Sequence, residues 1–164
     1  WEYSRGANVG QIKPQREFGT VTMQASDVTQ ELQLLYGFWD EEGKVDISAS
    51  HREGVIRPPR SKRVEVVAFN DYSQYQMAAH PLRRGQTVEE ADQEDELVLS
   101  IQNHPDITAI LLEVIKRLRA PAMRAEGLES EKMLFRDTPK ARVIWRNFLE
   151  LAARRMKNRV GAKE

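Results

Sequence analysis

Three histidines, His51, His80 and His104, are the residues of this chain best suited to proton transfer or metal binding. They are scattered, and none has metal-site spacing to another histidine or to an acidic pair. The simplest interpretation of each is a surface or loop histidine, and His104, which precedes Pro105, is explained as part of the start of a helix. The sequence therefore nominates no catalytic histidine, no metal site and no cofactor.

Carboxylates beside aromatic residues form the second group with possible chemistry, in "FWDEEG" (38–43) and "FNDY" (69–72). An apolar neighbour can raise the pKa of an acid enough for general acid catalysis. Both stretches are also typical of turns, where a carboxylate is solvated, and this is the preferred interpretation. An enzyme with a pocket at Asp40–Glu42 or at Asp71 and Tyr72 remains an alternative.

Several catalytic and binding motifs are missing from these 164 residues. The sequence has no cysteine, which excludes a cysteine nucleophile, a disulfide scaffold and a zinc ribbon within it. It also lacks a glycine-rich phosphate loop and a Gly-x-Ser-x-Gly nucleophile turn. We therefore expect a protein that is not an enzyme.

A basic loop stands out in "VIRPPRSKR" (55–63), because prolines bar a helix and a central strand there. A stiff, extended loop of this kind lowers the ordering cost of binding a phosphate or an acidic protein surface. A solubilising loop is the equally weighted alternative. The candidate contact residues are Arg57, Arg60, Lys62 and Arg63.

The segment 138–164 is predicted to be a basic amphipathic helix, capped by Thr138 with Pro139 in the first turn. Its apolar stripe consists of Trp145, Phe148, Leu149, Ala152 and Met156. Such a helix could dock into a partner protein, contact nucleic acid or lie on an anionic membrane. The cations selected as partner or phosphate contacts are Arg142, Arg146, Arg154 and Lys157.

The first half of the chain is predicted to be rich in strands. Residues 1–16 are expected to form an irregular arm anchored by Trp1, Tyr3 and Ile12. Residues 17–71 are expected to form a small β-rich unit with one short helix after Asp27. Its expected strands are 17–24, a strand after Gly43 with Val45 and Ile47 facing inward, and 63–72.

The second half is predicted to be helical. Residues 72–86 are expected to be a linker, and 87–164 a helical unit, although all parts could belong to one domain. Thr87 and Glu90 form a capping box that opens a helix over 88–103. A second helix, from Asp106 to the stop at Pro121, carries a regular apolar stripe over 107–118, which should pack on the stripe of the last helix. The expected fold is α+β, with a C-terminal antiparallel helical hairpin or bundle.

The composition limits the possible functions. The net charge is zero, with 25 basic and 25 acidic residues, which argues against a nucleic-acid binder that uses its whole surface. No apolar run approaches the roughly 20 residues that span a membrane. We expect a non-enzymatic structural or accessory subunit of a larger assembly, with other protein subunits as partners. The alternative is a nucleic-acid-binding ribosomal or nucleoprotein component. An intracellular location is expected, with the mitochondrion as one candidate.

Overall fold

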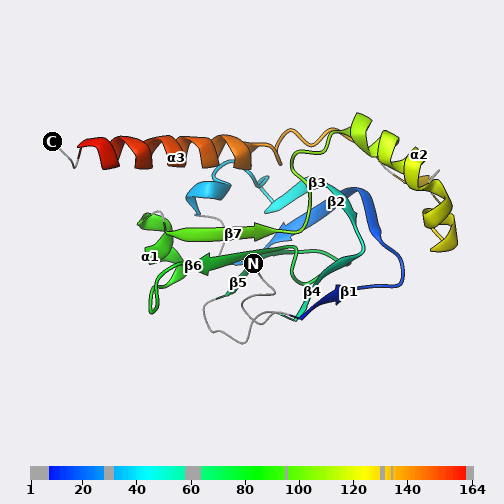
Figure 1. The fold of residues 1–164 in the computed structure, drawn as a ribbon, viewed down its shortest axis with the longest axis horizontal. Helices are drawn as coiled ribbons and strands as arrows, with labels where there is room; N and C mark the ends of the chain where they lie inside the picture. Colours follow the sequence, from blue (N-terminus) through cyan, green and yellow to red (C-terminus); the bar gives the residue numbers. More distant parts are fainter. Residues whose placement is uncertain are drawn as a thin grey trace.

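The computed structural model describes residues 8–27, 32–57, 64–94, 96–129, 132–133 and 135–161, except for the side chains of 158–161. Its centre is a curled antiparallel sheet with the strand order β3-β2-β5-β6-β7 (Figure 1). The strands of this sheet are β2 (Glu17–Ala25), β3 (Lys44–His51), β5 (Glu65–Phe69), β6 (Met77–Pro81) and β7 (Leu97–Ile101). A separate two-stranded sheet pairs β1 (Asn8–Gln11) with β4 (Glu53–Arg57).

The strands β2, β3 and β5 confirm the predictions for these segments. Along β2 and β3, the two-residue period places Met23 opposite Val45, and both side chains are buried in the core. Ile47 is buried two residues after Val45, on the same face of the sheet. Polar residues alternate with them, and Thr22 Oγ1 donates a hydrogen bond of 2.7 Å to Asp46 Oδ1 across the pair.

The strands β6 and β7 correct two predictions. The segment Met77–Pro81, expected within a linker, is a fully buried strand. The segment Leu97–Ile101, expected within a long helix, is strand β7, paired with β6 along its whole length. The capping box of Thr87 and Glu90 is confirmed, but its helix α1 (Val88–Gln93) is short. Burial on the sheet outweighs the weak strand propensity of the sequence "MAAHP".

The predicted C-terminal helical hairpin was wrong. Helix α2 (Ala109–Ala125) and helix α3 (Val143–Gly161) extend in opposite directions from the segment between them (Figure 1). On α2, Ile110 and Leu118 of the expected packing stripe are 79% and 77% exposed. The fold class is therefore corrected to a strand-rich architecture around a five-stranded antiparallel sheet.

The boundaries of both helices also differ from the prediction. Helix α2 starts at Ala109, where Thr108 Oγ1 accepts a hydrogen bond from the Leu111 amide, and it continues through Pro121. Helix α3 starts at Val143, because the residues from Thr138 to Arg142 form turns. Thr138 is therefore not the helix cap that the sequence indicated.

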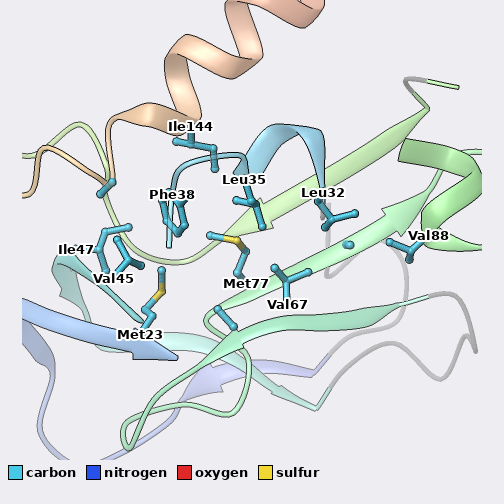
Figure 2. Close-up of a cluster of buried hydrophobic side chains, with 13 residues drawn as sticks. Met23, Leu32, Leu35, Phe38, Val45, Ile47, Val67, Met77, Val88 and Ile144 are labelled. Carbon is cyan, nitrogen blue, oxygen red and sulfur yellow. The ribbon is translucent and has the colours of Figure 1, made fainter. Parts of the chain in front are cut away.

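The main hydrophobic core lies between the sheet, the short 3₁₀ helix η2 (Gln33–Leu35) and the start of α3 (Figure 2). Phe38 and Leu35 fill its centre, and Ile144 closes it from α3. A smaller cluster under α2 contains Phe18, Ile107, Leu112 and Met123. The core thus uses strands from residues 17–71, 72–86 and 87–164, and the predicted division into these units stays a prediction.

The curled sheet brings its two ends together after β7. The His104 amide donates a 2.8 Å hydrogen bond to the Ser48 carbonyl on β3, the strand at the opposite edge. Ser48 Oγ in turn donates to the Ile107 carbonyl at 2.7 Å. We call this junction of Ser48 with residues 104–107 the seam.

An ion pair fastens the start of β2 to the end of α2. Arg16 binds Glu126 through two side-chain contacts, of 2.6 and 3.0 Å, and the Arg16 amide adds a third bond of 3.2 Å. Both side chains are about nine-tenths buried. These hydrogen bonds hold the pKa of Glu126 below its usual value of 4.5.

Replacement of Glu126 by Gln is expected to lower the free energy of unfolding at pH 7 by roughly 1.5–3 kcal/mol, the range for hydrogen bonds to charged groups. Since the folded pKa is depressed, this stabilisation is present above pH 4.5 and is lost as the pH falls through the folded value. Urea unfolding at several acidic pH values should therefore show a flatter pH dependence in the variant. Arg16→Gln should have the same effect, and additive losses in the double variant would contradict a shared interaction.

Candidate functional site

His104 lies in the segment that follows the edge strand β7, and the seam fixes its backbone. Its amide is bonded to Ser48, and its carbonyl accepts a hydrogen bond from the Ile107 amide at 3.3 Å. Neighbouring Asn103 and Pro105 are buried, whereas 40% of the His104 side chain is exposed. The fold thus holds an imidazole on a rigid backbone at the surface, where it can meet a substrate.

Asp106 is the charged partner of this imidazole. Its Oδ1 atom lies 3.9 Å from His104 Nδ1. At this distance the two side chains share no hydrogen bond, so Asp106 acts on the imidazole through its charge. Such contacts are often long in an empty site and shorten when substrate binds.

The surroundings of His104 favour its neutral form. Partial burial lowers the pKa of the His104 imidazole below its usual value of 6.5, and His51 and Arg119 act in the same direction. The Asp106 carboxylate opposes them by stabilising the protonated ring. A neutral imidazole at pH 7 is the form that a general base requires.

The His104 pKa provides a direct test of this arrangement. We expect its imidazole to titrate below pH 6.5, and Asp106→Asn to lower that pKa further by removing the opposing charge. NMR titration of the ring protons measures both values. Because the unfolded chain takes up this proton first as the pH falls, protonation should destabilise the fold on the acid side of about pH 6.5. An unchanged pKa in Asp106→Asn would show that the two groups do not interact.

A second histidine–carboxylate pair lies inside the fold. His51 Nε2 is 3.0 Å from Glu17 Oε2, but only 11% of the His51 side chain is exposed. The Glu17 carboxylate is also bound by Asn70 and by Gln76, whose Nε2 donates at 2.7 Å. This buried cluster is suited to holding β2, β3 and the 70–76 segment together. His104–Asp106 is the pair whose side chains are exposed.

The described residues supply no evident nucleophile for this pair. The sequence contains no cysteine. Ser48 contacts the backbone of His104, yet its hydroxyl is buried and donates to Ile107. The described side chains also contain no group of three or more histidines, aspartates or glutamates arranged to hold a metal ion. The site therefore offers an exposed imidazole with a carboxylate 3.9 Å from its Nδ1 atom.

This fold occurs in solved proteins that are described as amidotransferases. The chain matches a protein from Thermoplasma acidophilum that is described as a proposed GMP synthase subunit, with a TM-score of 0.56 and 18% identity. It also matches glutamine amidotransferases from Thermotoga maritima and Methylobacillus flagellatus, with TM-scores of 0.54 and 0.59 and identities of 13% and 12%. At these identities the likeness establishes the fold alone.

The match covers nearly all of this chain and a little more than half of each neighbour. The alignments include 99%, 93% and 92% of this chain, but only 55%, 56% and 58% of the respective neighbours. A large part of each neighbour thus has no counterpart in these 164 residues. No family model matches the chain, and no curated protein matches it in sequence.

These structures overturn the predicted function. A non-enzymatic structural or accessory subunit was expected, whereas the neighbours that share the fold are described as amidotransferases or as part of a synthase, so the fold is one that enzymes use. The prediction that the chain is not an enzyme was wrong for the same reason. The neighbours are not described as nucleic-acid-binding proteins either.

The structure describes some of the residues that were predicted to anchor the N-terminal arm or to contact a partner or phosphate. Ile12 is half-buried, and its amide donates to the Arg52 carbonyl, while Arg57 is exposed at the end of β4. Trp1, Tyr3, Arg60, Lys62 and Arg63 lie outside the described residues. The structure does not test whether any of this set contacts a partner.

The four predicted cations of the last helix segment lie on or beside α3. Arg142 pairs with Asp137 at 3.0 Å, and Arg146 lies 3.9 Å from Glu150. Arg154 donates to Gln33 Oε1 at 3.0 Å, while Lys157 is exposed. Three of the four thus interact within the chain, and the whole set stays a prediction.

From the sequence alone, His104 is expected at the start of a helix, without a catalytic role. The available signal is the short spacing of His104 and Asp106 after an apolar stretch, 97–101, that forms a strand and not the predicted helix. With that stretch as a strand, the pair follows a strand end, a common position for functional groups. No helix in the described part of the chain is long and apolar enough to cross a membrane. The mitochondrial location stays a prediction.

Proposed function

We propose that this chain forms the base-bearing part of an enzyme that hydrolyses the side-chain amide of glutamine, as the first step of amidotransfer. The observation that carries the proposal is the exposed His104–Asp106 pair, held by the seam of a fold that amidotransferases share. A histidine oriented by a carboxylate is the arrangement that activates a nucleophile for acyl transfer.

In this mechanism the nucleophile attacks the carboxamide carbon while His104 Nε2 accepts its proton. The resulting imidazolium is stabilised by Asp106 at Nδ1 and then donates the proton to the departing nitrogen, which leaves as ammonia. Water, deprotonated by the same imidazole, hydrolyses the acyl-enzyme to glutamate and restores the nucleophile. The lowered pKa of His104 keeps the base unprotonated at the start of each cycle.

The nucleophile itself is assigned to polypeptide outside these 164 residues. The sequence has no cysteine, and the chain spans 55–58% of the solved neighbours named above. Amide hydrolysis also needs donors that stabilise the developing oxyanion. We assign these donors to the same missing portion.

The test is ammonia release from glutamine by the full-length polypeptide that contains this chain. We expect glutamine-dependent ammonia and glutamate production in equal amounts, with no release by the isolated 164-residue chain. Asparagine, whose side chain is one methylene shorter, serves as the substrate control. A folded full-length protein that releases no ammonia from glutamine, with or without an added acceptor mixture, would exclude the proposed function.

A further inference from the structure

An apolar groove runs between β7 and α3 and reaches Pro105, the residue between His104 and Asp106. It has a volume of about 450 Å³ and is lined mainly by aliphatic and aromatic side chains from these two elements. Trp145 and Phe148, on its α3 wall, are 49% and 52% exposed. Their rings meet edge to face at 6.5 Å.

The strand wall of the groove has an open edge. β7 is the last strand of the sheet, and β6 is its only partner among the described residues. On the side away from β6, no described strand pairs with the backbone donors and acceptors of β7, and the half-buried apolar side chains of "LVLSI" lie next to them. This combination promotes pairing with another strand. The groove therefore offers backbone hydrogen bonds on one wall and apolar contacts on the other.

We propose that this groove is the docking surface for the part of the amidotransferase-like fold that the chain does not include. That portion would add a strand to the free edge of β7 and place apolar side chains against Trp145 and Phe148. The inference rests on the proposed function, because the same portion is assigned the nucleophile. Docking beside β7 would bring it next to the segment that carries His104, three residues after the strand ends.

Completion of the fold explains the groove better than a second copy of the chain. The alignments with the solved neighbours include 92–99% of this chain but only 55–58% of each neighbour's own chain. A sheet edge beside apolar side chains is the kind of surface that the additional part of such a fold would cover. The two walls of the groove are a sheet strand, β7, and a helix, α3. A further strand with apolar side chains would extend the sheet and pack against the helix.

The test compares amide hydrogen exchange in the isolated 164-residue chain and in the full-length polypeptide. We expect the outward amides of β7 to exchange at least about tenfold more slowly in the full-length protein, because they gain strand partners. Phe148→Glu should reverse this protection by placing a charge in the apolar contact. Leu149→Glu is the matched control, since Leu149 is 65% exposed on the same helix but does not line the groove.

The possible results separate this inference from the proposed function. Equal exchange of β7 in the two proteins, or equal effects of Phe148→Glu and Leu149→Glu, would overturn the docking proposal. Protection that grows with the concentration of the isolated chain would also overturn it, because it would identify a second copy as the occupant. Protection without ammonia release would retain the docking surface and reject the catalytic function.

Discussion

Replacing His104 by Gln should reduce the glutamine hydrolysis rate of the full-length protein by about 10²–10⁴-fold, the usual contribution of a positioned acid–base group. Glutamine keeps a polar side chain at this exposed position but cannot carry the proton from the nucleophile to ammonia. Because the His104 backbone, and not its ring, makes the seam bonds, the fold should be preserved. Steady-state ammonia release, corrected for the folded fraction, measures the effect.

Two further variants make this result specific. Asp106→Asn should reduce the rate less, by up to about 100-fold, because the imidazole remains but is poorly oriented. His51→Gln should chiefly lower stability, since His51 lies in the buried cluster with Glu17. If His51→Gln abolished turnover in folded protein while His104→Gln retained it, the general base would be the wrong histidine of the two.

Replacing Phe38 by Ala should have the largest effect on stability, roughly 3–5 kcal/mol less free energy of unfolding. Phe38 is completely buried between η2, the sheet and Ile144 (Figure 2). Its ring also packs edge to face on Trp39, with 4.7 Å between the ring centroids. Its removal leaves a cavity where the helix layer meets the sheet. Since small proteins are stable by only about 5–15 kcal/mol, the loss is a large fraction of the total.

Urea denaturation monitored by circular dichroism gives the magnitude. Tyr36→Ala is the matched control, because Tyr36 is aromatic, two residues away and 78% exposed, so its loss should change stability by no more than about 0.5 kcal/mol. A Phe38→Ala protein as stable as the control would show that this part of the core is not packed as the structure indicates.

The N-terminal strands could be predicted because their local pattern agrees with their environment. Val45 and Ile47 alternate with polar residues and face the core, as the two-residue period requires. The capping box of Thr87 could be predicted equally well, since both of its hydrogen bonds connect Thr87 with Glu90, three residues later. In these places the sequence signal and the physical cause are local.

The remaining part of the fold depends on contacts between distant residues. The strand β6 is defined by its burial between β5 and β7, which a window around "MAAHP" cannot reveal. The apolar stripe of α2 was assigned to a packing partner, yet Ile110 and Leu118 are exposed. The candidate site was missed because His104 becomes recognisable only when β7 is a strand and Ser48 fixes the following residues.

The seam also has a consequence for the order of folding. Ser48 and His104 are joined across the two ends of the strand order, so their contact closes a long loop that contains β4, β5, β6 and β7. The entropy of closing such a loop is lost before the contact contributes any stability, which makes this kind of pairing slow to form. A nascent or partly unfolded chain would therefore hold its early hairpin of β2 and β3 without a positioned imidazole. Proton-transfer competence would arise only with the final closure of the sheet.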